Sequence, residues 1–225
     1  MTDRVIAITG GHGVLGRAVV EAALADGLKV AIIDHAPGQS APEGVLELGG
    51  VDLTDPASAQ TAIDRVAAHF GRLDALFNIA GGFVWQTTDD ADPAWASMFA
   101  LNVATALNAS RAALPHLKAS AEGRIVNVGA NAALKSAAGM GAYAASKAGV
   151  HRLTESLAEE LKDTSVTVNA VLPSILDTAR NRQDMPDADP AKWVTPADLA
   201  RVMLFLASPE SRAITGALIP VTGRV

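Results

Sequence analysis

Tyr143 and Lys147 are the two residues whose types and spacing point most directly to catalysis. They are four residues apart in a segment with the pattern of a helix, so both side chains lie on one face, one turn apart. A phenol with a pKa of about 10 exchanges protons slowly at neutral pH, and a neighbouring ammonium favours its ionised form. The pair predicts lysine-assisted proton transfer. The alternative is an aromatic side chain lying over an exposed lysine, although Tyr143 is the only tyrosine in the chain.

A glycine cluster near the amino terminus indicates binding of a phosphate-containing ligand. Gly10, Gly13 and Gly16 lie in the sequence Thr-Gly-Gly-His-Gly-Val-Leu-Gly, directly after an apolar segment. Glycines here allow a tight turn and a close approach of a pyrophosphate to the N–H groups that open a helix. An ordinary glycine-rich connection would have the same composition.

Asp34 makes the ligand more specific. It ends the apolar segment 29–34, about 20 residues beyond the glycine loop, where a carboxylate can accept hydrogen bonds from both hydroxyls of an adenosine ribose. The same charge would repel the 2′-phosphate of NADP(H), and the next residue, His35, is neither Arg nor Lys. The alternative is that Asp34 caps a turn. We expect NAD(H) as the preferred cofactor and NADP(H) as the less favoured one.

The elements that must position these residues follow from two alternating kinds of segment. Short runs rich in Val, Ile and Leu, typical of strands buried on both faces of a parallel sheet, alternate with longer amphipathic runs rich in Ala. This pattern predicts an α/β fold of the Rossmann type, a doubly wound parallel sheet of about seven strands with helices on both faces. Strands are expected near 4–9, 28–33, 45–51, 73–78, 124–128, 166–172 and 217–221, and helices near 14–26, 56–70, 93–118, 141–162 and 196–208.

The 225 residues fall within the range of one α/β domain, so residues 1–225 are expected to form a single unit. The stretch 173–195 lacks clear periodicity and has four prolines in or next to it. A loop of this length in a compact domain is usually functional, and we expect it to be a lid over the substrate.

Composition excludes several classes of partner. A net charge of −6 leaves no basic surface for nucleic acid, and the absence of cysteine excludes disulfides and metal–thiolate sites. No apolar run approaches the roughly 18 residues of a membrane span, and the first residues lack the pattern of a signal peptide. We therefore expect a cytoplasmic protein with a small-molecule substrate, no metal, no nucleic acid partner and no membrane contact.

Further short motifs follow one another along the chain: Asp52-Leu53, Asn78-Ile-Ala-Gly81, Asn102, Tyr143-Ala-Ala-Ser-Lys147 and the segment 168–178. With the glycine loop, they give the chain a resemblance to the short-chain dehydrogenase/reductase family over essentially its full length. The resemblance implies an NAD(P)-dependent oxidoreductase. Its catalytic residues would be Tyr143, Lys147 and Asn102, with Asn102 in a proton relay, although a helical asparagine is also commonly a satisfied polar residue.

The same resemblance implies where the cofactor would lie. Lys147 would hold the nicotinamide ribose, and Asp52 and Leu53 would meet the adenine. The nicotinamide carboxamide would be held by Pro173, Leu176 and Thr178. The implied cofactor residues are Gly10, Gly13, Leu15, Gly16, Asp34, Asp52, Leu53, Asn78, Ala80, Gly81, Tyr143, Lys147, Pro173, Leu176 and Thr178.

Three positions depart from the family pattern. Val14 stands where the loop has its middle glycine, and Ser174 stands where the family has a glycine near the nicotinamide. Ala130 stands where the family carries a catalytic serine, and losing one such donor can cost on the order of 10²–10³ in rate when an alkoxide forms. Either Asn131 or Ser136 replaces the serine, or the enzyme is degenerate, or the substrate builds no charge on an oxygen.

Several segments favour the third explanation. Residues 129–134, 139–143, 149–153, 170–178 and 181–189, followed by Trp193, are similar to dihydropteridine reductases, as are the glycine spacing and Ala130. This resemblance implies an NADH-dependent reductase of a conjugated imine or quinonoid acceptor such as a dihydropterin. The alternatives are a general carbonyl or alcohol oxidoreductase and, in a different class, a catalytically degenerate dinucleotide-binding sensor or structural protein.

Aromatic and apolar residues suggest the remaining contacts. Phe83 and Trp85 follow a predicted strand at its carboxyl end, where ligands bind in such sheets. A flat pterin could stack on Trp85, with less expected of Phe83, and Ala130 and Tyr143 would complete the substrate site. Aromatic residues in loops also pack under lids or at subunit contacts. The apolar helices near 93–118 and 141–162 predict a homodimer or homotetramer.

Overall fold

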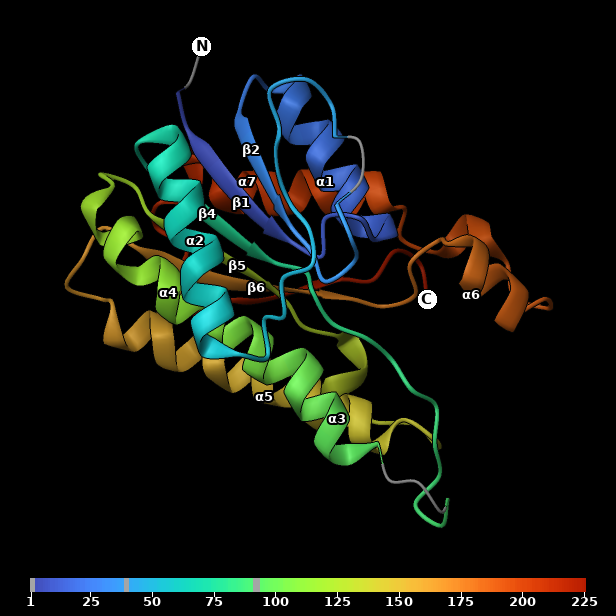
Figure 1. Cartoon of the computed structure of the whole chain (residues 1–225). Coiled ribbons are helices and arrows are strands. Elements are labelled where there is room, and N and C mark those ends of the chain that lie inside the picture. The colour runs from blue at the N-terminus through green and yellow to red at the C-terminus, as the bar shows by residue number, and fades with distance from the viewer. Residues whose placement is uncertain (1–2, 39–40, 91–93) are drawn as a thin grey trace.

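Seven parallel strands form the centre of the computed structural model, which describes residues 3–38, 41–90 and 94–225. Figure 1 shows the sheet with helices around it. All neighbouring strands pair in parallel. The predicted doubly wound sheet of about seven strands is confirmed. In order across the sheet the strands are β3 (Leu46–Leu48), β2 (Lys29–Ile33), β1 (Val5–Thr9), β4 (Ala75–Asn78), β5 (Arg124–Val128), β6 (Thr167–Pro173) and β7 (Leu218–Val221).

Alternating side chains of the strands build a hydrophobic core on each face of the sheet. In β1, Ile6 and Ile8 pack with residues of α1 (Val14–Ala25) and α7 (Pro196–Ala207), which share one face. Val5 and Ala7 point to the other face. Both faces are covered, which explains why the strands are continuous apolar runs rather than alternating ones. The second face carries α2 (Pro56–Phe70), α4 (Thr105–Ala119) and α5 (Gly141–Glu160).

The helix predicted near 93–118 is a single element in the sequence pattern but three segments in the structure. It consists of α3 (Trp95–Phe99), a π-helical turn (Ala100–Ala104) and α4, and position 93 lies outside the described residues. The turn carries Asn102, whose side chain hydrogen-bonds both backbone groups of Gly82. Apolar periodicity does not report such a local change in winding, and turns of this kind are frequent at functional sites.

The segment 173–195 is also more ordered than its sequence predicts. It contains the short helix α6 (Ala179–Asp184), capped by Thr178, and a 3₁₀ turn (Pro190–Lys192), capped by Asp189. Both are too short to produce a periodic pattern. Trp193 is only 5% exposed, so it anchors the end of this segment in the protein. In the described part of the chain, no helix has the length and apolar character that a membrane crossing requires.

Two glycines of the loop before α1 differ in how much space surrounds them. A Cβ on Gly16 would lie 2.2 Å from the Gly10 carbonyl oxygen and 2.7 Å from the Gly11 Cα, both backbone atoms. A Cβ on Gly13 would meet only the Gly10 oxygen, at 3.3 Å, and its φ of −67° suits any residue. The loop therefore depends on glycine at position 16 far more than at position 13.

We expect Gly16→Ala to lower the free energy of unfolding by about 1–3 kcal/mol or more, because the backbone must move to admit the methyl group. For a domain of this size, each kcal/mol corresponds to about 2–4 °C in Tm. Thermal unfolding followed by circular dichroism measures the change, with Gly13→Ala as the matched control. Equal Tm values for the two variants would contradict the packing described here.

Candidate functional site

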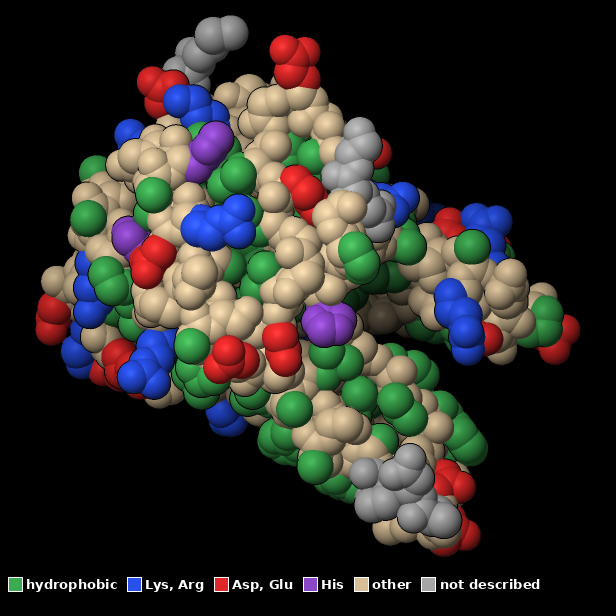
Figure 2. Space-filling model, in the orientation of Figure 1, with side chains coloured by type: hydrophobic (Ala, Val, Ile, Leu, Met, Phe, Trp, Pro, Cys, Tyr) green, Lys and Arg blue, Asp and Glu red, His purple; other side chains and the backbone are tan. Residues whose placement is uncertain are grey.

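The site lies at the carboxyl ends of the strands, where the strand order reverses between β1 and β4. Ligands of open α/β sheets bind at such a point, because the connections from the two neighbouring strands diverge to opposite faces. Figure 2 shows the molecular surface hollowed between the part that carries α6 and the part that carries α3. The glycine loop follows β1, and residues 79–82 follow β4, so both enter this region.

The glycine loop packs directly on the connection after β4. A Cβ on Gly10, whose φ is +68°, would lie 2.9 Å from the N and Cα of Ala80. Gly13 is the N-cap of α1 and supplies no side-chain cap, and the first turn has no acidic residue. The helix dipole and its first N–H groups are therefore left for an anion. Leu15 is 6% exposed and packs in the core, so its side chain positions the helix.

The Asp34 carboxylate organises this loop before any ligand binds. It accepts hydrogen bonds from the backbone N–H groups of His12 and Ala36, each at 2.9 Å. The turn-capping alternative is therefore real, but a carboxylate has about four acceptor positions, so acceptor capacity remains for ribose hydroxyls. Asp34 thus serves the loop and is also available to a ligand.

Asp52 and Leu53 differ in exposure. The Asp52 carboxylate is exposed and accepts hydrogen bonds from the side chain and backbone N–H of Thr54, which hold its pKa below the usual range. Leu53 is 5% exposed, and its carbonyl accepts from Asn108. Asp52 is thus accessible to a ligand, whereas the Leu53 side chain belongs to the core.

The connection after β4 is held by buried polar side chains. Thr9 Oγ1 accepts from the N–H groups of Ile79 and Ala80, at 3.0 and 3.1 Å. Asn78 Nδ2 donates to Ser110 Oγ and Asn127 Oδ1, at 2.9 and 2.8 Å, so this amide group points into the protein interior. Asn78 Oδ1 is buried with no hydrogen-bond partner in the described chain.

Tyr143 and Lys147 lie one turn apart on α5, as the spacing predicts. Lys147 is 6% exposed, and its Nζ donates to the Val128 carbonyl at 2.7 Å. Gly81 is also close to the ammonium, since a Cβ there would be 3.4 Å from Nζ. No ion pair joins Lys147 to a carboxylate among the described residues.

Burial sets the protonation of both groups. It raises the pKa of Tyr143 to about 12 and lowers the pKa of Lys147 to about 8. Burial disfavours the ionised phenol, and the assistance of Lys147 to proton transfer stays a prediction. At neutral pH the phenol is protonated and available as a proton donor.

Asn102 connects the β4 loop to α5. Its Oδ1 accepts from the N–H of Gly82 at 2.9 Å, and its Nδ2 donates to the Gly82 carbonyl at 3.1 Å and to Ser146 Oγ at 2.9 Å. Ser146 Oγ in turn donates to the Tyr143 carbonyl at 2.7 Å. Asn102 therefore fixes the loop relative to Tyr143, a contact that the sequence pattern did not reveal, and its part in a proton relay stays a prediction.

Ala130, which is 2% exposed, supplies no hydroxyl where the family has its serine. Ser136 is exposed, and its Oγ donates to the Ala137 carbonyl, while Asn131 is half-buried in a 3₁₀ turn. The Ala130 N–H donates a hydrogen bond to His151 Nε2, at 3.3 Å. Sequence reasoning missed His151, although it follows Lys147 by one helical turn.

The segment after β6 is held by several polar contacts. Pro173 is the buried last residue of β6, and Ser174 Oγ donates to the Thr222 carbonyl at 2.7 Å. Leu176 forms an isolated parallel bridge with Val194. Thr178 caps α6 by accepting from the Asn181 N–H. These contacts place the predicted carboxamide-binding residues near the carboxyl end of β6, and their binding role stays a prediction.

The two aromatic residues after β4 have different neighbours, and the substrate contact expected of Trp85 stays a prediction. Phe83 contacts the Tyr143 ring edge-on, with ring centroids 5.0 Å apart. Trp85 lies over Gly139, where a Cβ would be 2.1 Å from the indole, and it is 61% exposed. Phe83 is therefore the one that lies beside the predicted proton donor.

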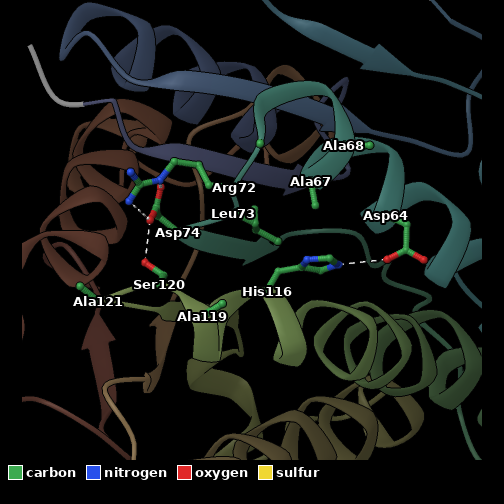
Figure 3. A pocket seen from close by; sticks show the side chains of 11 residues that line it. Asp64, Ala67, Ala68, Arg72, Leu73, Asp74, His116, Ala119, Ser120 and Ala121 are labelled. Atoms are coloured by element: carbon green, nitrogen blue, oxygen red, sulfur yellow. Dashed lines mark hydrogen bonds and ion pairs between the residues drawn. The ribbon is translucent and has the colours of Figure 1, made fainter.

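A cavity of about 600 Å³ lies elsewhere, between α2 and α4 at the opposite end of β4 (Figure 3). Its ionisable side chains are already paired, His116 with Asp64 and Arg72 with Asp74. Asp74 also accepts from Ser120, and these contacts hold its pKa below the usual range despite burial. The cavity contains none of the predicted site residues and is a structural feature of the helix ends.

The residues at the sheet edge fit a nicotinamide dinucleotide. The uncapped start of α1 suits a pyrophosphate, and Asp34 retains acceptor capacity for a ribose. Lys147 has three N–H donors, and one of them binds Val128. Within the described ranges, no group of three His, Asp or Glu side chains lies close enough to hold a metal ion.

Comparison with known proteins agrees with this assignment. The short chain dehydrogenase family model matches residues 4–189. The 2-(S)-hydroxypropyl-CoM dehydrogenase 3 of Xanthobacter autotrophicus is 33% identical over 99% of this chain and 96% of its own length. The 3-oxoacyl-(acyl-carrier-protein) reductase MabA of Mycobacterium bovis is 32% identical over 98% of this chain and 92% of its own.

Solved structures show the same architecture. The ligand-free aldohexose dehydrogenase of Thermoplasma acidophilum superposes with a TM-score of 0.89 at 26% identity, over 99% of this chain and 93% of that one. A 3-ketoacyl-(acyl-carrier-protein) reductase of Brucella melitensis complexed with NADH gives 0.85 at 25% identity, over 98% and 97%. The chain therefore belongs to the short-chain dehydrogenase family and is an oxidoreductase that uses a nicotinamide dinucleotide.

Proposed function

We propose that the protein uses NADH to reduce a conjugated imine or quinonoid acceptor, of which a dihydropterin is the model compound. The observation that carries this proposal is Ala130, a buried methyl-bearing residue at the position of the family's serine. A ketone becoming an alkoxide needs a hydrogen-bond donor near its oxygen. Reduction of a conjugated imine builds no alkoxide, so the missing hydroxyl costs little.

The roles of the chain's own residues follow from their contacts. Tyr143 is the proton donor, because its hydroxyl is protonated at neutral pH and no hydrogen bond to it is found within the described chain. Lys147, fixed by the Val128 carbonyl, holds the nicotinamide ribose. Asn102 maintains the position of the β4 loop. When bound, the nicotinamide supplies the hydride.

The remaining contacts complete the proposal. Asp34, Asp52 and the start of α1 hold the adenosine and pyrophosphate, with NAD(H) preferred. The segment 173–195 covers the substrate as a lid, and Phe83 and Trp85 supply apolar surface beside it. On α3 and α4, Trp95, Phe99 and Leu107 are 45%, 42% and 43% exposed, which supports association of copies into a dimer or tetramer.

A second candidate is oxidation or reduction of an alcohol–carbonyl pair. The relatives named for a hydroxypropyl group and for 3-oxoacyl groups favour it. In this case a donor other than the hydroxyl of a serine at position 130 must stabilise the oxygen. Steady-state assays with NADH and quinonoid dihydropterin, cyclic imines and simple ketones separate the two candidates. Absence of turnover with every acceptor would instead favour a dinucleotide-binding sensor.

The charge of Asp34 predicts that NADH binds more tightly than NADPH. Asp34→Asn removes the charge and keeps an acceptor for one of the two backbone N–H groups, whereas Asp34→Ala removes both acceptors. We expect both variants to narrow the difference in affinity between the two coenzymes. Fluorescence titration of NADH and NADPH measures these affinities. Equal or tighter binding of NADPH to the wild type would contradict the assignment.

We expect Tyr143→Phe to reduce kcat by about 10²–10⁴-fold, the usual contribution of a positioned acid, because it removes the donor and keeps the ring. Its NADH affinity should change much less. Lys147→Ala should lower both kcat and NADH affinity, since in the proposed mechanism the lysine holds the nicotinamide ribose and assists proton transfer. Rapid-mixing kinetics and NADH titration separate the effects. Full activity of Tyr143→Phe would mean that the proton comes from elsewhere.

Ala130→Ser distinguishes the two acceptor classes. If the natural acceptor is a conjugated imine, the variant should leave that reaction unchanged or slower, while activity toward simple ketones rises tenfold or more. A restored donor is worth about 2.7–4 kcal/mol at most, which limits the gain. Ala132→Ser adds a hydroxyl two residues away and serves as the control. Equal acceleration of all acceptors by Ala130→Ser would favour a damaged ketone reductase.

A further inference from the structure

His151 is a buried histidine that has no role in the proposed reaction. It is 2% exposed and lies on α5, four residues after Lys147 and eight after Tyr143. At this spacing the three side chains follow one stripe of the helix. Because His151 lies on the same face of α5 as Tyr143 and Lys147, a change in its charge would alter the electrostatic environment of both.

The imidazole contacts the backbone at the end of β5. Nε2 accepts a hydrogen bond from the Ala130 N–H at 3.3 Å. A Cβ on Gly129 would lie 2.6 Å from Nε2 and 2.7 Å from Cδ2, so the ring occupies the space that any other residue at position 129 would need. Lys147 holds the Val128 carbonyl two residues earlier. Two side chains of α5, one turn apart, therefore hold residues 128–130.

The contact with Ala130 requires a neutral ring. Nε2 can accept only when it carries no proton, so the tautomer assigned by this geometry has its hydrogen on Nδ1. Burial, followed by the charges of Arg152 and Lys147, lowers the pKa of His151, so the ring is neutral at pH 7. Gly129 and Ala130, which follow β5 and lie against the ring, carry no titratable side chain, and neither does Leu172 of β6, which lies near Gly129.

Protonation of His151 would replace its hydrogen bond with the Ala130 N–H by repulsion between two N–H groups. The ring would then present an N–H to the N–H of Ala130, and a second positive charge would lie one turn from Lys147. The Ala130 amide would lose its buried acceptor, which is costly unless the backbone moves. Movement of residues 128–130 would displace the carbonyl that fixes Lys147.

We propose that His151 is a positioning residue that holds residues 128–130 in place for Tyr143 and Lys147, and that its protonation below neutral pH releases them and lowers turnover. The proposal deepens the proposed function and rests on it for the roles of Tyr143 and Lys147. Ala130 then has two roles in the proposal. Its side chain stands at the position of the family's serine, and its backbone N–H binds His151 on α5.

The first test needs no turnover. In ¹⁵N NMR of the NADH-bound protein, His151 should show an unprotonated Nε2 and a protonated Nδ1 at pH 7.5, assigned by loss of the signals in His151→Gln. The Ala130 amide signal should shift with the same midpoint as the His151 nitrogens on acidification. A protonated Nε2 at pH 7.5, or an Ala130 signal that ignores the titration, would overturn the proposal.

The second test is a pH profile of kcat with the best acceptor found, measured from pH 8 downward through the His151 midpoint that the NMR titration gives. Wild-type kcat should fall by about tenfold per pH unit below the His151 midpoint, as for loss of one essential unprotonated group. His151→Gln keeps an acceptor that does not titrate, so it should retain activity at pH 7 and lack this acid limb. His151→Leu removes the acceptor and should lower kcat at every pH.

His116 provides a control for the pH profile, because it is a histidine far from the site. His116→Gln changes the histidine paired with Asp64 at the far end of the sheet and should leave the profile unchanged. A merely structural role would lower Tm in His151→Leu but leave kcat and its pH dependence as in the wild type, which would overturn the proposal, as would an acid limb retained by His151→Gln. If the wild type turns over no acceptor, the proposed function fails while the NMR test still decides the role of His151.

Discussion

The buried ammonium of Lys147 is the group on which the geometry of the site depends. Removing a charge from water costs several kcal/mol, and no carboxylate among the described residues compensates it. The Val128 carbonyl is its hydrogen-bond partner, at the last residue of β5. Gly81 approaches from β4, where a side chain would collide with Asn102. The ends of two neighbouring strands are therefore arranged around one cation. The desolvation of this cation is unfavourable, and it occurs where a bound ligand can accept hydrogen bonds from the remaining N–H groups of Lys147.

The strand ends around this cation are held by side chains rather than by the sheet ladder. Beyond its last paired residue, a parallel strand leaves backbone groups without ladder partners. Thr9 satisfies two of them after β4, Asn102 satisfies the two of Gly82, and His151 satisfies Ala130. These buried polar residues make a preorganised edge, so the connections that would contact the cofactor are already fixed by the protein.

The sequence predicted the fold nearly completely, because seven apolar strands and their helices repeat a pattern that both faces of a parallel sheet impose. The glycine loop, Asp34, Tyr143 and Lys147 could also be located, since each has a spacing with a mechanical reason. The π turn at Asn102, helix α6 and the contact of His151 with Ala130 could not. They depend on residues distant in the chain meeting in space, or on elements too short for periodicity. Burial raises the pKa of Tyr143, and the extent of burial cannot be read from a local motif.

The π turn has a consequence for the helix that contains it. An α-helix turns by about 100° per residue, so one extra residue in a turn rotates everything after it by that angle. The apolar stripe of α3 and that of α4 are thus out of phase with each other. Met98 of α3 packs with Ala142 of α5, whereas Ala109 and Ala113 of α4 face the core of the sheet. A single continuous stretch of chain can in this way serve two partners in different directions without a loop between them.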